Sequence, residues 1–181
     1  MADLIKEGKI SSWGISETDE DYLRKAHAVC PVSAIQNRYS MMARWYENLF
    51  PVLEELKIAY VAFSPMANGL LSGKFTTETK FTSNDDCRSF MPQFTQEGID
   101  KASVLLELLN NIAAEKNATP SQISLAWMLC KKPYIIPIPG SRKEERLKEN
   151  LDSANVILTK EEVKNIDEKL DTMKFLVFGG H

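Results

Sequence analysis

The sequence has little of what several kinds of functional site require. Its only histidines, His27 and His181, nearly exclude a metal site built from several imidazoles. Its three cysteines are odd in number and far apart, which favours a reducing compartment over a disulfide framework. No apolar run approaches the roughly 20 residues needed to span a membrane, and residues 1–7 lack the basic-then-apolar pattern of a signal peptide. We therefore expect a cytoplasmic protein with no membrane partner.

Basic residues are not in excess either. The chain has 22 lysines and arginines against 25 aspartates and glutamates, so it offers no overall basic surface to nucleic acid. Two glycine-rich phosphate motifs are missing, G-x-G-x-x-G after a strand and G-x-x-x-x-G-K-[ST]. What is present is 181 residues, 44% of them hydrophobic, without a repeat or a linker. This composition predicts a single domain over residues 1–181.

Short apolar runs alternate with amphipathic segments along the chain. The continuously apolar run at residues 58–63 is typical of a strand buried on both faces. Capping-box patterns place Thr119, Ser141 and Thr159 at helix starts, and Thr18 is a further expected N-cap. Strands are expected at 10–15, 32–36, 58–63 and 134–138, and helices at 22–29, 45–56, 104–113, 120–131, 141–151 and 159–170.

Four strands separated by helices predict a parallel α/β sheet with right-handed crossovers. Two architectures fit this pattern: an open, doubly wound sheet, and part of a (β/α) barrel. In both, functional groups gather at the carboxyl ends of the strands. Those ends are polar, which suits a ligand surface: Ser16-Glu17, Gln36-Asn37, Ser64-Pro65 and Gly140-Ser141-Arg142.

The segment from Ile138 to Arg146 is the sharpest local signal. A strand ends, a glycine allows close backbone approach, and a helix start follows, which is the arrangement that attracts anions. Arg142 and Arg146 are four residues apart, so one helix face would carry both guanidinium groups. The spacing fits a phosphate site and fits equally a surface helix whose arginines pair with neighbouring glutamates.

Residues 64–99 contain many glycines and prolines and little periodicity, and a loop of this length is usually functional or mobile. Its segment from Gly69 to Lys74 would either wrap a phosphate or be a plain flexible loop. Gln36, within an apolar run, fits a structural hydrogen bond or a ligand carboxamide. Phe63 stands out among the aromatic residues because it ends a strand on the expected ligand side.

Five stretches of the sequence carry a more specific signal: residues 4–16, 35–40, 62–74, 119–127 and 136–150. They include Ser-Pro-Met-Ala-Asn-Gly-Leu-Leu-Ser-Gly-Lys at 64–74 and Ile-Pro-Ile-Pro-Gly-Ser-Arg at 136–142. Together they resemble the aldo-keto reductase family, over essentially the whole chain. The resemblance implies a partial (β/α)8 TIM-type barrel, in which this chain matches the C-terminal half, the fifth to eighth βα units.

The family binds an extended nicotinamide dinucleotide, usually NADPH, so the resemblance implies NADP(H) as cofactor. It places Ser16 and Gln36 at the nicotinamide carboxamide and Phe63 against the nicotinamide ring. It places Ser64, Met66, Asn68, Gly69 and Lys74 in the segment that follows the pyrophosphate. It places Ser141, Arg142 and Arg146 at the 2′-phosphate, and Glu149 and Asn150 at the adenine amino edge.

The resemblance also implies what the chain does not carry. Its sequence matches the family from within the helix before the fifth strand, and the earlier units supply the catalytic Asp, Tyr, Lys and His. None of the five tyrosines matches the catalytic one, and Glu17 stands where many relatives have Asn. We therefore expect no catalytic residue here, and reduction of an aldehyde or ketone only if the barrel is completed.

A four-stranded half-barrel would leave two open strand edges and exposed apolar side chains, which invite pairing with another chain. We expect self-association through these edges, or a partner that carries the missing half. The alternatives to an enzyme segment are a non-catalytic NADP-binding module and a structural fragment. The uncapped start around Leu4 fits a truncated reading frame as well.

Overall fold

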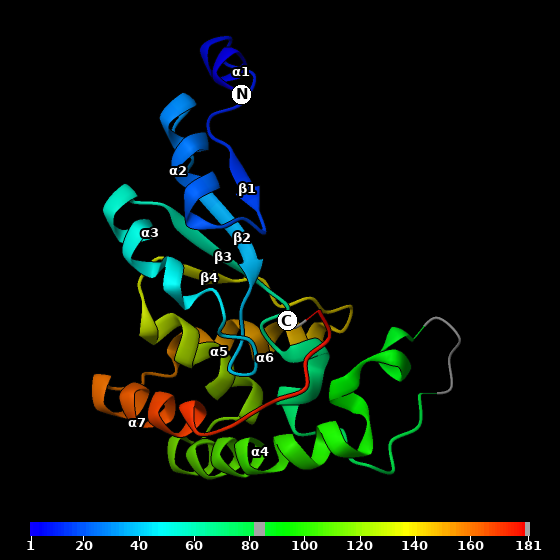
Figure 1. Cartoon of the computed structure of the whole chain (residues 1–181). Helices are drawn as coiled ribbons and strands as arrows, with labels where there is room; N and C mark the ends of the chain where they lie inside the picture. The colour runs from blue at the N-terminus through cyan, green and yellow to red at the C-terminus, as the bar shows by residue number, and fades with distance from the viewer. Residues whose placement is uncertain (82–85, 180–181) are drawn as a thin grey trace.

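The computed structural model describes residues 1–81 and 86–179. A parallel sheet of four strands forms its centre, and Figure 1 shows helices α2 and α3 packed beside it. Part of the expected long loop, residues 82–85, lies outside the described residues. The strands are β1 (Gly14–Ser16), β2 (Ala34–Arg38), β3 (Ala59–Phe63) and β4 (Ile135–Pro137). The α-helices are α1 (Ala2–Lys6), α2 (Glu20–Val29), α3 (Phe50–Leu56), α4 (Gln96–Lys116), α5 (Pro120–Lys131), α6 (Glu144–Asp152) and α7 (Lys160–Asp171).

The strands follow one another across the sheet in the order β1-β2-β3-β4, and every neighbouring pair is parallel. A doubly wound sheet reverses its strand order at one point, and this sheet does not. When each strand lies beside its predecessor, right-handed crossovers carry all the connecting segments to the same face. The order therefore fits a segment of a (β/α) barrel and excludes the doubly wound alternative.

Helices cover one face of the sheet and leave the other open. On the open face, Ser16, Gln36, Val61 and Ile136 stand in one row across the four strands. Gln36 is exposed, and Ile136 keeps 49% of its surface exposed. The residues buried on the helix side are Ile35, Asn37, Tyr60, Ala62 and Ile135.

The expectation that residues 58–63 are buried on both faces is therefore wrong. Tyr60 and Ala62 of β3 are fully buried, whereas Ala59, Val61 and Phe63 are only half-buried because no layer covers them. All four expected strands are present, with shifted ends. The largest shifts are in β1, which starts at Gly14 rather than at residue 10, and in β2, which runs to Arg38.

Helix starts follow the sequence signals in two of four cases. Thr119 and Thr159 form complete capping boxes at α5 and α7. At α2, Asp19 rather than Thr18 is the cap, since its carboxylate accepts the Tyr22 N–H at 2.8 Å.

Two other helical segments differ from expectation. The segment expected at 45–56 is a 3₁₀ turn (Glu47–Leu49) followed by α3. Helix α4 has 21 residues and begins at Gln96, inside the expected loop, because Thr95 caps it through the Gly98 N–H.

The core beneath the sheet joins an aromatic cluster to a network of charges. The ring of Tyr39 stacks on Trp127 with centroids 5.4 Å apart. The Tyr39 hydroxyl donates to Glu47 at 2.6 Å, and Lys131 donates to the same carboxylate at 2.6 Å and to Asp167 at 3.0 Å. These contacts connect the segment after β2 to helices α5 and α7, so the charged network holds three separate elements together.

Burial alone would raise the pKa of Glu47, but hydrogen bonds from Arg44, Lys131 and Tyr39 outweigh it and hold that pKa below its ordinary value. A carboxyl whose folded pKa is lowered stabilises the fold above its unfolded pKa, and that contribution is lost as the pH falls. Glu47 therefore makes the fold acid-sensitive below about pH 4.3, the ordinary glutamate value.

We predict that Glu47→Gln lowers the free energy of unfolding at pH 7 by about 1–3 kcal/mol, and that the variant loses less stability than the native chain on acidification to pH 3. Urea denaturation at several pH values measures both effects. Exposed Glu145 provides the control, and Glu145→Gln should leave the pH profile unchanged. Parallel profiles for the native chain and Glu47→Gln would contradict the assignment.

Candidate functional site

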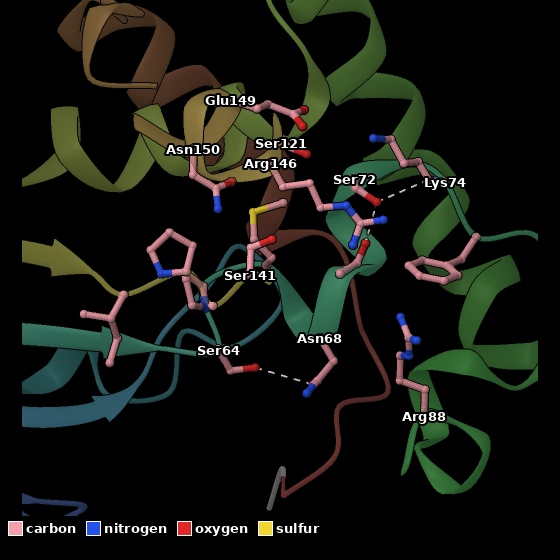
Figure 2. A pocket seen from close by; sticks show the side chains of 17 residues that line it. Ser64, Asn68, Ser72, Lys74, Arg88, Ser121, Ser141, Arg146, Glu149 and Asn150 are labelled. Atoms are coloured by element: carbon pink, nitrogen blue, oxygen red, sulfur yellow. Dashed lines mark hydrogen bonds between the residues drawn. The ribbon is translucent and has the colours of Figure 1, made fainter. Parts of the chain in front are cut away.

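A cavity of about 480 Å³ lies beyond the carboxyl ends of β3 and β4. One wall is the segment that follows β3, from Ser64 to Phe75, and the opposite wall runs from Ile138 into α6. Figure 2 shows Ser64, Asn68, Lys74, Arg88 and Arg146 around this space, with Glu149 and Asn150 at its upper end. The cavity has the size of an ordinary small-molecule site.

The wall after β3 has an unusual backbone. Ser64, Ala67 and Asn68 all have positive φ, as does Gly69 at +98°. Such left-handed residues are sparse among non-glycines, and clusters of them occur at ligand-binding loops. The turn is supported from behind by Gln93, which is fully buried, donates to Asn68 Oδ1 at 3.1 Å and accepts the Phe178 N–H at 2.9 Å. The C-terminal segment thus helps to fix the shape of the wall.

Three cations face the cavity. Arg88 is fixed because Asp86 accepts from its Nε at 2.7 Å and its guanidinium lies 5.0 Å from the ring centroids of both Phe75 and Phe81. Hydrogen bonding from the Arg88 side chain lowers the pKa of the Asp86 carboxyl. In the parts of the chain that the structure describes, neither Lys74 nor Arg146 forms an ion pair, so both charges are available to an anionic ligand.

The wall formed by α6 differs from the sequence expectation. The helix starts at Glu144, and Lys143 rather than Ser141 is its N-cap. Ser141 instead closes a short turn, where its hydroxyl accepts the Lys143 N–H at 3.1 Å. Arg142 therefore precedes the helix, and the expectation that Arg142 and Arg146 share a helix face is wrong. Arg146 lines the cavity, whereas Arg142 is exposed outside it.

The structure brings most of the candidate site residues together. The candidates that line the cavity are Ser64, Met66, Asn68, Gly69, Lys74, Ser141, Arg146, Glu149 and Asn150. Ser16, Gln36 and Phe63 lie apart from it on the open face of the sheet. Ser16 ends β1 and Phe63 ends β3, whereas Gln36 is the middle residue of β2 rather than its end. There Ser16 donates to the Gln36 carbonyl at 2.8 Å, and the Arg38 guanidinium covers one side of Phe63 at 4.9 Å.

Several residues that line the cavity were not among the predicted site residues, including Ser72, Arg88 and Ser121. Arg88 lies in a segment that shows no periodicity, and its only signal is the phenylalanines near it in the sequence. Ser121 follows Pro120 in the first turn of α5, where its type suggests capping rather than binding. Within the described residues, no group of three His, Cys, Asp or Glu side chains could hold a metal ion, and no helix could cross a membrane.

Comparisons with known proteins agree with this architecture. The model of the aldo/keto reductase family matches residues 1–171. The chain belongs to the aldo/keto reductase family. Among curated relatives, the aldo-keto reductase str7 of Strobilurus tenacellus is 40% identical over 167 residues, which are 90% of this chain and 49% of that protein. The chain thus spans about half the length of the curated relatives it matches.

Solved structures of the family share the fold. The glycerol dehydrogenase AKR11B4 of Gluconobacter oxydans has a TM-score of 0.85 at 26% identity, over 94% of this chain and 52% of that one. An aldo/keto reductase of Klebsiella pneumoniae, solved in complex with NADP and acetate, has a TM-score of 0.66 at 22% identity, over 98% of this chain and 55% of that one.

We predict that the turn at Gly69 depends on glycine. A Cβ there would lie 3.2 Å from Phe75 Cε2, and the φ of +98° is strained for any L side chain. Gly69→Ala should lower the free energy of unfolding by about 1–2 kcal/mol. Gly140 lines the same cavity, and a Cβ there meets nothing within 4 Å, so Gly140→Ala should change stability by less than about 0.5 kcal/mol. Equal effects of the two substitutions in urea denaturation would refute the prediction.

Proposed function

We propose that the chain is the NADP(H)-holding half of an aldo-keto reductase barrel. The observation that carries the proposal is the cavity, which has three cations along its length and an acceptor pair, Glu149 and Asn150, at one end. A nucleotide phosphate group needs such cations, and an adenine amino edge needs such acceptors. We further propose that these four βα units correspond to the fifth to eighth of the family.

In this proposal the parts of the cofactor spread along the carboxyl ends of the strands. Arg146 and Ser141 hold the 2′-phosphate, with Arg142 at its rim. Ser64, Met66, Asn68, Gly69 and Lys74 follow the pyrophosphate, and the fixed guanidinium of Arg88 adds a third cation there. The proposal is supported by the position of Arg146 and Lys74 on opposite walls of one cavity (Figure 2).

The nicotinamide end is proposed for the open face of the sheet. Ser16 and Gln36 are neighbours in the parallel register and would hold the carboxamide, and Phe63 would stack on the ring. Asn37 supports this end, because its Oδ1 accepts the Glu17 N–H at 2.7 Å and holds Glu17 at a φ of +48°. Since the Arg38 guanidinium covers one side of the Phe63 ring, we expect the nicotinamide ring to stack on the other side or to displace the guanidinium.

The bound cofactor would supply a hydride to the carbonyl carbon of an aldehyde or ketone, and an acid must protonate the oxygen. None of the five tyrosines lines the cavity. The Tyr39, Tyr60 and Tyr134 hydroxyls donate to Glu47, the Arg38 carbonyl and Glu54. We therefore propose that the acid and its partners come from outside these residues, and that the isolated chain binds cofactor without turning over a carbonyl substrate.

Fluorescence titration of the purified chain with NADPH and NADH tests the proposal. We expect saturable binding that is tighter for NADPH, and we expect Arg146→Ala to weaken NADPH by about tenfold or more while changing NADH by less than about twofold. Lys148 is on the same helix outside the cavity and pairs with Glu144, so Lys148→Ala is the matched control. Equal losses for both nucleotides, or equal weak binding of both, would refute the 2′-phosphate assignment.

The open face of the sheet favours a second property, self-association. Ile136 and Ile138 on the edge strand and its continuation are 49% and 44% exposed, and a parallel sheet is normally covered on both faces. We propose that two copies cover these faces in the absence of a partner that carries complementary βα units.

Sedimentation velocity should give a dimer or larger species, and Ile136→Lys should shift it toward the monomer because a charge on the open face opposes burial. Ile157 is 67% exposed and lies in the connection between the 3₁₀ turn Ser153–Asn155 and α7, outside the four strands, so Ile157→Lys should leave the distribution unchanged. A compact monomer of the native chain at all concentrations would overturn this proposal and leave the cofactor proposal intact.

A further inference from the structure

The hydroxyl of Thr119 has two roles at the cavity. Its oxygen accepts the Gln122 N–H at 3.2 Å, and the Thr119 N–H donates to Gln122 Oε1 at 2.9 Å, which completes the capping box of α5. The same hydroxyl donates its proton to Glu149 Oε1 at 2.7 Å. Glu149 is on α6 and lines the cavity, so Thr119 connects the start of α5 to a cavity carboxylate 30 residues further along the chain.

Helix capping alone does not require this second bond. Thr159 forms the same capping box at α7, where its hydroxyl accepts the Glu162 N–H at 3.1 Å and its N–H donates to Glu162 Oε2 at 2.7 Å. A capping hydroxyl uses its lone pairs, so its proton remains available for another acceptor. At Thr119 that proton goes to the cavity carboxylate, which Thr159 does not contact.

Glu149 has an unusual place for an anion. It lines a cavity that also contains Lys74, Arg88 and Arg146, yet among the described residues it forms no ion pair with any of them. The bond from Thr119 fixes one carboxylate oxygen, and a carboxylate has further lone pairs on the other. A fixed acceptor next to phosphate-binding cations suits a ligand that carries an amino group at one end and phosphate at the other.

We propose that Thr119 is a positioning residue that orients Glu149 to accept a hydrogen bond from an exocyclic amino group, so that the site distinguishes an aminopurine nucleotide from an oxopurine one. This inference rests on the proposed binding of NADP(H) and adds a specificity that depends on a residue of α5. An oxopurine presents a carbonyl oxygen at the same position, and two acceptors facing each other lose a hydrogen bond and repel.

The experiment compares NADPH with reduced nicotinamide hypoxanthine dinucleotide phosphate, in which an oxo group replaces the 6-amino group and N1 carries a proton. Both are titrated by fluorescence into the full chain. Thr119→Asp retains an acceptor for the Gln122 N–H, because aspartate is a strong N-cap, but it removes the hydroxyl proton and places a like charge beside Glu149. Thr119→Ser retains both roles. Thr159→Asp repeats the exchange at a cap outside the cavity.

We expect the native chain and the Thr119→Ser and Thr159→Asp variants to bind NADPH about tenfold more tightly than the hypoxanthine analogue. This ratio corresponds to one hydrogen bond to a charged group. In Thr119→Asp the preference should fall to within about twofold, while the preference for NADPH over NADH persists. The NADH comparison separates loss of amino recognition from general damage to the site.

Two results would overturn the inference in different ways. If Thr119→Asp keeps the native preference between the two purines, or if the native chain has none, Thr119 is only a helix cap and the cofactor proposal stands. If the native chain binds neither nucleotide, the proposed function fails and the inference fails with it. Thr119→Val removes the cap as well as the hydroxyl proton, and the folded variant should also lose the preference between the two purines. If Thr119→Val does not fold, the result for Thr119→Asp decides.

Discussion

The parallel pairing of β3 with β4 is the constraint on which the candidate site depends. Parallel strands bring their carboxyl ends to the same edge, so the segments that follow Phe63 and Pro137 emerge side by side. One becomes a turn of left-handed residues, and the other leads into α6. The cavity between them therefore joins residues more than 70 positions apart, from Ser64 to Asn150. Each wall is supported by one hydrogen bond from behind: Gln93 donates to Asn68 on one wall, and Thr119 donates to Glu149 on the other.

The same sheet has two very different faces. Its helix-covered face is a well-packed core, in which Tyr39, Tyr60 and Trp127 are fully buried. Its other face is a row of side chains, Ser16, Gln36, Val61 and Ile136, without a covering layer. In a closed barrel such a row faces the interior. The chain matches about half the length of its relatives, which agrees with a sheet that has one face uncovered. Both observations support the proposal that cofactor binding and proton delivery belong to different segments of a barrel.

Features that depend on local sequence could be predicted, and features that depend on tertiary contacts could not. The capping boxes at Thr119 and Thr159 involve residues three positions apart, so their pattern is visible in the sequence. Ser141 has the same pattern, but its hydroxyl closes a turn with Lys143, and α6 starts later. Arg88 was missed because its place depends on Phe75 and Phe81, which only the folded loop brings around it. The open face of the sheet was predicted wrongly at β3, because an apolar sequence does not show whether a second layer covers the strand.

A crystal structure of the chain grown with NADPH would show directly whether the cavity holds the cofactor. We expect the 2′-phosphate within hydrogen-bond distance of Arg146 and Ser141, the adenine amino group on Glu149, and the dinucleotide running past Asn68 toward Phe63. A nucleotide bound elsewhere, or one whose 2′-phosphate lies in solvent away from Arg146, would contradict it.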